Sequence, residues 1–218
     1  MSALFSTAYL PPVQYVATLL QHTDIQVEAK ETYPKQTYRN RALIQTAGGV
    51  RPLTVPVVRT QGNHSRTEDI AIDYRTRWNV VHLRTLEAAY AASPYYFYYR
   101  DGLADALQQR YDRLLDLNQA LLAWLQKCLK TNVKVELTAD WLPLGAEGAP
   151  AHQHDYRNAF SPKSTPHSSP LTPHYPPYYQ VFADRHPFVP GLSVVDLLFN
   201  LGPEATGYLR AAGGNVQD

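Results

Sequence analysis

The chain has 218 residues, with 20 Lys and Arg against 19 Asp and Glu, which gives a formal net charge of +1. This length suffices for one large domain or two small ones, and the balanced charge does not indicate a protein of nucleic acids or membrane surfaces. The single cysteine, Cys128, excludes an intrachain disulfide framework and a multi-cysteine metal site. The sequence shows neither a spanning apolar run nor a signal-peptide pattern, so we expect a cytoplasmic protein without membrane insertion.

The N-terminal part predicts a strand, a helix and a second strand. Residues 4–9 favour a strand that ends at Pro11-Pro12, and the prolines suit the first turn of a helix over 13–21. Residues 24–29 alternate apolar and polar side chains, which is the period of a half-buried strand.

A hairpin is predicted next, because residues 41–45 and 51–58 flank a Gly48-Gly49 turn. Pro52 and Pro56 cannot donate to a ladder, so the second strand is expected at an edge or with a bulge. A polar loop over 60–66 and a short strand over 68–73 follow.

The middle of the chain is predicted to be helical. An amphipathic stripe begins at Trp78 and continues to Tyr90, and Ser93-Pro94 ends that helix. We expect Asp101 to cap a second helix and Asp116 to begin a third. Residues 133–138 are expected to form the last strand of this block.

Residues 143–178 contain eight prolines and four histidines, and we predict an irregular loop that interrupts one domain made of 1–142 and 179–210. His152, His154 and Asp155 have no specific metal spacing, so a flexible spacer is the preferred interpretation and no metal is predicted. Order is expected to return at Tyr179, with an apolar helix over 192–200 and a frayed tail over 211–218. The fold class predicted from these elements is a single α/β domain with a mixed sheet.

Positive charge is concentrated in residues 28–66, where seven Lys and Arg against two Glu give +5. Within it, the segment PKQTYRNR places Lys35, Arg39, Asn40 and Arg41 in seven residues at a strand entrance. Arginine offers a planar fork for carboxylate or phosphate, so these groups could hold an anionic substrate. A solvated loop with surface ion pairs is the alternative.

Three other features each permit more than one interpretation. His82, on the apolar stripe, could be a general base or a buried structural histidine. Glu28 and Glu31 could act as acid or base, could orient the basic cluster, or could be solvated. The aromatic run from Tyr95 to Tyr99 could stack on a sugar or a base, or could pack between helices. We expect Cys128 to be an inert core thiol.

Six ordered segments together resemble one family. They are YLPPVQY (9–15), KQTYRNR (35–41), LTVPV (53–57), W-x3-H (78–82), AYAASPYY (89–96) and LSVVDLLFN (192–200). The pattern is similar to the WbqC-like protein family, and the resemblance covers nearly the whole chain apart from residues 143–178. The usual opening Gln-Pro of that family is here Thr7-Ala8.

The resemblance implies a place in bacterial surface-polysaccharide (O-antigen) biosynthesis or modification, with an activated sugar or an acyl or aminoacyl donor as ligand. The leading hypothesis is a transferase-like enzyme in which His82 is the general base. Its substrate-binding residues would be Lys35, Tyr38, Arg39, Asn40, Arg41 and Tyr95. The alternative is a non-catalytic binding or assembly protein of the same pathway, and nucleic-acid binding is a weaker third. No cofactor is identified by these motifs.

Overall fold

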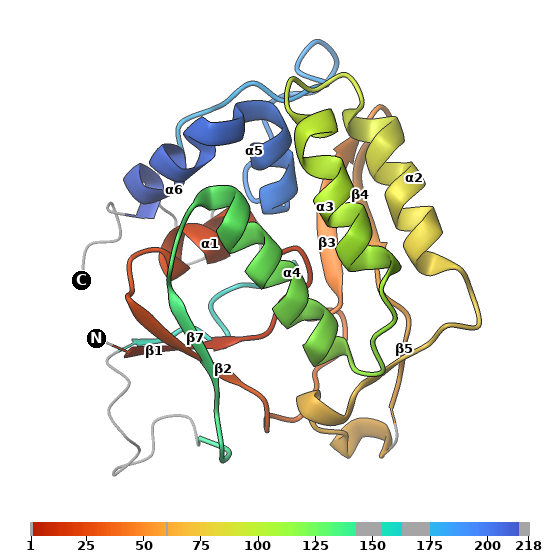
Figure 1. The fold of residues 1–218 in the computed structure, drawn as a ribbon, viewed down its shortest axis with the longest axis vertical. Helices are drawn as coiled ribbons and strands as arrows, with labels where there is room; N and C mark the ends of the chain where they lie inside the picture. The colour runs from red at the N-terminus through yellow and green to blue at the C-terminus, as the bar shows by residue number, and fades with distance from the viewer. Residues whose placement is uncertain (1, 60, 143–153, 163–174, 214–218) are drawn as a thin grey trace.

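A computed structural model describes residues 2–59, 61–142, 154–162 and 175–213. Most of the chain expected to be irregular, residues 143–153 and 163–174, lies outside the described residues, as do residues 214–218. The α/β class predicted from the sequence is confirmed, since the chain begins with a strand, a helix and a parallel strand and continues to a helical middle (Figure 1).

A four-stranded parallel sheet is built around the N-terminal strand. Its order is β7 (Lys134–Leu137), β2 (Asp24–Glu28), β1 (Ser2–Ser6), β8 (His154–Asp155). The predicted unit of strand, helix and strand is present, because α1 (Val13–Leu19) connects β1 with β2. The first strand covers Ser2–Ser6 rather than residues 4–9, and the chain bends at Tyr9 and at Leu10, which adopts a φ of 40°. Two residues of β8 fall inside the range expected to be irregular.

Antiparallel pairs occur in separate two-stranded sheets rather than in the main sheet. The predicted hairpin is formed by β3 (Arg41–Thr46) and β4 (Gly49–Thr54). A second pair joins β5 (Val57–Val58) to β6 (Ala71–Ile72). The strand expected over 68–73 is thus reduced to two residues. The backbone before it closes into a 3-10 turn, η2 (Thr67–Asp69), with Asp69 N–H donating to the Arg66 carbonyl. A further short turn, η1 (Gly62–His64), precedes it.

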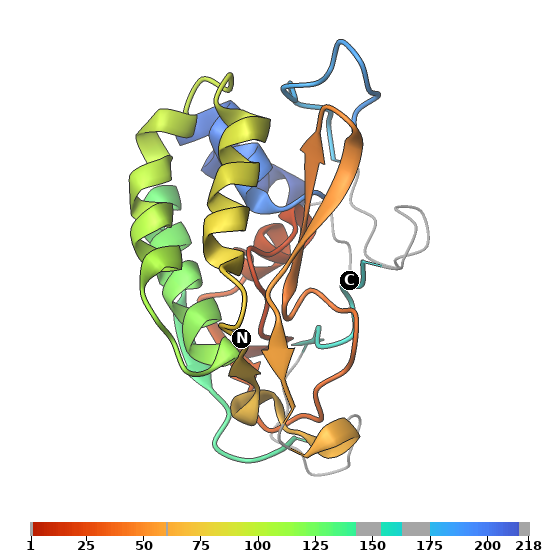
Figure 2. The same ribbon diagram turned by 90° about the vertical axis from the view of Figure 1, so that its right-hand side faces the viewer.

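Three helices form a layer beside the β3–β4 hairpin (Figure 2). They are α2 (Trp78–Tyr90), α3 (Tyr96–Gln108) and α4 (Leu114–Leu129). The predicted amphipathic stripe gave α2 its correct start and end, because Trp78, Leu86 and Tyr90 are buried. The caps predicted for the next two helices were wrong. Asp101 lies inside α3 on its exposed side, and α4 begins before Asp116 because the extended Arg113 is its N-cap.

The C-terminal part folds back onto this core. It contains α5 (Val194–Leu201), the 3-10 turn η3 (Gly202–Glu204) and α6 (Ala205–Gly213). Ser193 N–H donates to the Leu43 carbonyl, and Val194 N–H donates to the Pro11 carbonyl. The expected fraying from residue 211 was wrong for residues 211–213, since α6 continues through them with Ala212 buried.

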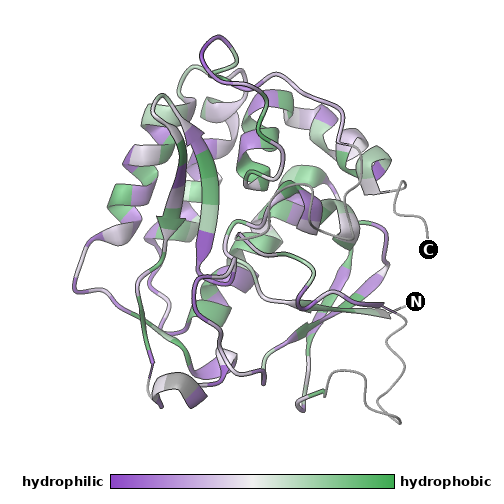
Figure 3. Ribbon diagram, turned by 180° about the vertical axis from the view of Figure 1, so that it is seen from behind, coloured by the Kyte–Doolittle hydropathy of each residue, from purple (hydrophilic) through white to green (hydrophobic). Residues whose placement is uncertain are grey.

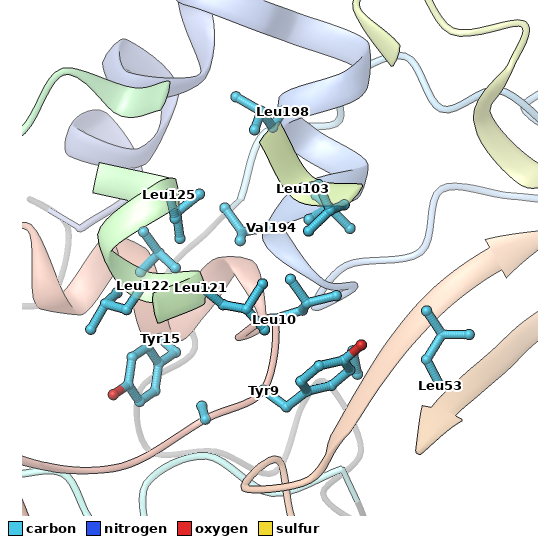
Figure 4. Close-up of a cluster of buried hydrophobic side chains, with 14 of the residues drawn as sticks. Tyr9, Leu10, Tyr15, Leu53, Leu103, Leu121, Leu122, Leu125, Val194 and Leu198 are labelled. Carbon is cyan, nitrogen blue, oxygen red and sulfur yellow. The ribbon is translucent and has the colours of Figure 1, made fainter. Parts of the chain in front are cut away.

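One apolar core lies where α1, α4 and α5 meet the loop after β1. In Figure 4, Leu10, Leu121, Leu125 and Val194 point toward one another from these segments. Hydrophobic and hydrophilic residues alternate in bands along the helices (Figure 3), as expected when each helix buries one face. This core fixes the ends of the parallel strands, where the polar side chains described next are found.

Candidate functional site at the carboxyl end of the parallel sheet

The parallel strands end together in a set of polar side chains. Ser6 is the last residue of β1, Glu28 of β2 and Asp155 of β8, and Thr138 directly follows β7. The strand order reverses at β1, because the chain passes from β1 toward β2 and β7 but places β8 on the opposite side. In open α/β sheets the carboxyl edge at such a reversal is where ligands bind.

Arg157 ties two of these strand ends together. Its Nη2 lies 2.6 Å from Oδ2 of Asp155, and its Nη1 donates to Oε2 of Glu28 at 3.3 Å. Glu28 is fully buried and also accepts from Thr138 Oγ1 at 2.8 Å and from the Lys30 N–H at 2.8 Å. A buried carboxylate with this many donors is held in one position.

Arg39 is connected to Arg157 through the hydroxyl of Ser6. It is 4% exposed, and its Nε and Nη2 donate to the two carboxylate oxygens of Glu31 at 2.7 and 2.6 Å. Nη2 also donates to Ser6 Oγ at 2.6 Å, and that hydroxyl donates to the Arg157 carbonyl at 2.7 Å. We call Ser6, Glu28, Glu31, Arg39, Asp155 and Arg157 the ion-pair network.

The charges of three arginines act on Tyr33, on the loop between β2 and β3. Burial raises the pKa of Tyr33 to about 12, and the positive charges of Arg59, Arg39 and Arg41 act in the opposite direction. The guanidinium of Arg59 lies 5.1 Å from the centre of the Tyr33 ring. We call these three arginines and Tyr33 the arginine cluster. Two of the three come from the basic segment that the sequence singled out.

Two donors in the arginine cluster are buried without a hydrogen-bond partner in the described part of the chain. They are the Tyr33 hydroxyl and Nε of Arg41. Buried polar groups are nearly always hydrogen-bonded, so an unpaired pair of donors beside three guanidinium groups marks a place where an anion or an ordered water would be stabilised.

His82 lies on α2, close to the start of the hairpin. Its Nδ1 is 2.8 Å from the Tyr9 hydroxyl, and its ring packs edge-on against Trp78. Burial lowers the pKa of His82 to about 4, although the backbone of Thr54 acts in the opposite direction. Thr54 pairs with Arg41 across the hairpin, so His82 is connected to the strand entrance that carries the basic segment. The imidazole is 5% exposed and neutral at pH 7.

The other residues predicted to bind substrate differ in their placement. Lys35 is exposed on the loop, next to Gln36 with its φ of 58°. Tyr38 is partly buried, and its carbonyl accepts from the Tyr9 N–H at 2.8 Å. Asn40 is 9% exposed, and its Nδ2 donates to the Val55 carbonyl at 2.8 Å. The side chain of Asn40 is therefore engaged within the protein.

Tyr95 does not join the basic segment. It is the N-cap of α3, its N–H donates to the Phe199 carbonyl at 3.0 Å, and its ring lies against Gly202. The structure thus places Arg39 and Arg41 where both charges act on Tyr33, and it places Tyr95 beside α5 and η3 instead.

A second buried carboxylate was not singled out by the sequence interpretation. Asp196 of α5 is fully buried and accepts from the hydroxyls of Tyr90 at 2.8 Å and Tyr178 at 2.6 Å. Burial raises the pKa of Asp196, while these two hydroxyls and Gln180 lower it. A signal was available, because Asp196 is the one charged residue in the apolar segment LSVVDLLFN.

Ser6 and Arg157 were missed for a different reason, and Asp155 was considered only as a metal ligand. They carry no recognisable motif, and two of them lie in the range predicted to be an irregular loop. Within the described ranges, no group of three or more His, Cys, Asp or Glu could hold a metal ion. His154, considered above as a metal ligand, stacks on Tyr156 at 5.8 Å. No helix in the described ranges is both long and apolar enough to cross a membrane.

The fold and this site define an α/β protein with charged side chains at the carboxyl edge of a small parallel sheet. The model of the WbqC-like protein family matches residues 7–155 and 167–208, and the chain belongs to that family. It is similar to an uncharacterized protein of Mycobacterium tuberculosis, Rv1507c, with 28% identity over 223 residues, covering 93% of this chain and 91% of that protein. The comparison with solved structures found no match.

Proposed function

We propose that this chain is a transferase-like enzyme of bacterial surface-polysaccharide (O-antigen) biosynthesis or modification, and that it binds an anionic activated donor at the arginine cluster. Membership of the WbqC-like family supports the pathway. The observation that carries the binding site is the pair of unpartnered buried donors, the Tyr33 hydroxyl and Arg41 Nε, among three guanidinium groups.

The residues of the cluster have different tasks in this proposal. Arg41 and Arg59 supply guanidinium forks for a phosphate or carboxylate of the donor. Arg39 adds positive charge while Glu31 and Ser6 fix its position. Lys35 adds a further charge from the exposed loop.

Two polar neighbours complete the proposed site without contributing charge. Tyr38 lies beside the cluster in the same segment, and Asn40 holds the strand entrance through the Val55 carbonyl. Both residues would therefore orient the donor through the shape of the loop.

His82 is the general base of this proposal. Its neutral ring can accept a proton at pH 7, and Tyr9, hydrogen-bonded to its Nδ1, links it to the loop that carries Tyr38. A base with a pKa of about 4 is a weak one, since catalytic bases work best near the operating pH.

The enclosure of His82 favours a second candidate, a non-catalytic protein that binds an anionic glycan precursor or assembles with a partner enzyme. In that case His82 is a packing residue, because its ring is 5% exposed between Tyr9 and Trp78. The arginine cluster would still bind the anion, so the two candidates share a binding test and differ in turnover.

The binding test is calorimetric titration of the purified chain with UDP-glucose and with acetyl-CoA. One donor is expected to bind, and Arg41→Gln is expected to weaken its binding by at least about tenfold, the loss of one charge-assisted contact. Arg51→Gln is the matched control, since Arg51 lies on the same hairpin opposite Ile44 and is expected to leave affinity unchanged. Equal effects of both variants, or no binding of either donor, would overturn the proposed site.

Turnover then separates the two candidates. Release of UDP or free CoA is followed in the presence of sugar acceptors, for the wild type and for His82→Gln. Loss of release in a variant that still binds the donor supports the enzyme. Full release by that variant would remove His82 from the catalytic role, and no release by the wild type would favour the assembly protein.

A further inference from the structure

A separate groove lies at the far end of α4, between its last turn and the first turns of α3. Its volume is about 380 Å³, within the range of small-molecule sites. The arginine cluster touches the other half of α4, where Asn118 Nδ2 donates to the Arg39 carbonyl. Nine residues of helix separate Asn118 from Lys127 in the groove, which is about 14 Å. The two sites are therefore distinct.

Aromatic side chains form one wall of the groove. Tyr98 and Tyr99 of α3 pack edge to face with their ring centres 4.7 Å apart, and Trp124 of α4 completes the aromatic part of the lining. Tyr98 is 79% exposed, so most of its ring surface faces solvent even though it contacts Tyr99. Exposed tyrosine and half-buried tryptophan rings present apolar faces together with polar edges, which suits stacking on a sugar ring.

Gly102 gives Trp124 its place in the groove. It lies in the interior of α3, where alanine would be favoured by about 1 kcal/mol. A Cβ at Gly102 would lie 2.8 Å from Nε1 and 3.1 Å from Cδ1 of the Trp124 indole. The missing side chain therefore lets the indole lie directly against α3, and it is part of how the groove is formed.

The lining of the groove also carries positive charge. Lys127 and Lys130 are exposed at the end of α4, and none of the described residues that line the groove carries a carboxylate. Lysines at a helix C-terminus often bind its last carbonyls. Here other donors do so: the Lys130 and Thr131 N–H groups bond the Lys127 and Gln126 carbonyls, and Thr206 Oγ1 donates to the Leu129 carbonyl at 2.7 Å. Among the described residues that line the groove, no carboxylate pairs with either ammonium group, so both can contact a ligand.

We propose that this groove binds a sugar that carries an anionic group, a sugar phosphate being the simplest example. The ring stacks on Tyr98 and Trp124, and the phosphate lies between Lys127 and Lys130. This binding does not depend on the donor site proposed above, because the groove shares no residue with the arginine cluster.

The indole N–H signals in a 1H–15N NMR spectrum test the proposal, because the chain has three tryptophans. Trp124→Phe assigns one signal, and glucose 1-phosphate is titrated into the wild type. The Trp124 signal is expected to shift and to saturate, while those of Trp78 and Trp141 stay in place. Glucose alone and inorganic phosphate alone are each expected to bind at least about tenfold more weakly. Absence of a saturable shift overturns the proposal, and tighter binding of uridine monophosphate would make the groove a nucleotide site instead.

Variants on two helices give a matched control. Gly102→Ala pushes a methyl group into the Trp124 indole and is expected to abolish the shift, whereas Gly207→Ala on α6, where a Cβ would meet nothing within 4 Å, is expected to leave it intact. Lys127→Gln combined with Lys130→Asn removes both charges, with asparagine suited to the left-handed φ of 51° at position 130. This double variant is expected to bind glucose 1-phosphate no better than glucose. Full affinity in either the Gly102 or the lysine variant would overturn the proposed binding mode.

Discussion

Arg157 Nη1 donates to Oε2 of Glu28 at 3.3 Å, across a separation of 129 residues, and both side chains are removed from water. Glu28 ends β2 and Arg157 follows β8, so the pair reaches over the end of β1, which lies between these strands. β8 has a ladder of only two residues. The ion pair, together with the bond from Tyr156 N–H to the Leu4 carbonyl, therefore holds the segment 154–162 on the sheet.

Glu28→Gln is predicted to lower the free energy of unfolding by about 3 kcal/mol, because it leaves Arg157 buried with an incomplete set of partners. Urea denaturation followed by circular dichroism measures the change. Glu136→Gln is the control, since Glu136 lies on the neighbouring β7 and pairs with Lys134 at the exposed surface; little change is expected there. Similar losses in both variants would show that burial of the Glu28 pair does not matter for stability.

This pair also shows why the sequence could not predict the whole site. The helix α2 was predicted because apolar side chains recur at helical spacing between Trp78 and Tyr90, which is a local signal. β8 has no such repeat, and its place is set by Arg157 and by backbone bonds to a strand about 150 residues earlier. Contacts of that separation leave no periodic trace in a single sequence.

The sequence located a concentration of basic side chains, and its role in binding stays a prediction. Tyr38 and Arg39 lie in a turn before β3 begins at Arg41, and the charges of Arg39 and Arg41 both act on Tyr33. The sequence did not predict the two hydrogen bonds between Arg39 and Glu31. They depend on how the loop between β2 and β3 folds back. The concentration of positive charge in the sequence thus indicated where the basic side chains lie, but not which carboxylate binds Arg39.

His82 is predicted to make the protein sensitive to acid. Its pKa is about 4 in the folded chain against an ordinary value of 6.5 for histidine, so the unfolded chain binds a proton that the folded chain does not between these values. Stability from this group is therefore present above pH 6.5 and decreases as the pH falls toward 4. Each unit of difference between the folded and unfolded pKa of His82 corresponds to about 1.4 kcal/mol. Between pH 6.5 and 4 the free energy of unfolding is therefore expected to fall by up to about 3 kcal/mol. Urea denaturation at several pH values between 7.5 and 4 measures it.

The variant His82→Gln isolates this contribution, because glutamine does not titrate and can still bond the Tyr9 hydroxyl. Its stability is expected to change less with pH than that of the wild type over the same range. His64→Gln, at an exposed position of η1, is expected to keep the wild-type pH dependence. If His82→Gln also kept that dependence, the histidine would be protonated in the folded chain, and it would have to be more accessible than the structure shows.

Gly202 provides a test of whether Tyr95 has a structural role. Gly202 has a φ of 55°, and a Cβ there would lie 2.5 Å from Cγ of the Tyr95 ring. Gly202→Ala is predicted to lower the free energy of unfolding by about 2–5 kcal/mol, through backbone strain and overpacking together.

Gly62→Ala separates the two causes, because Gly62 has a φ of 57° but a Cβ there would meet nothing within 4 Å. This variant is expected to lower the free energy of unfolding by about 1 kcal/mol. Denaturant midpoints measure both. Equal losses in the two variants would mean that the Tyr95 ring moves aside without cost, which would leave Tyr95 free for the substrate-binding role that the sequence predicted.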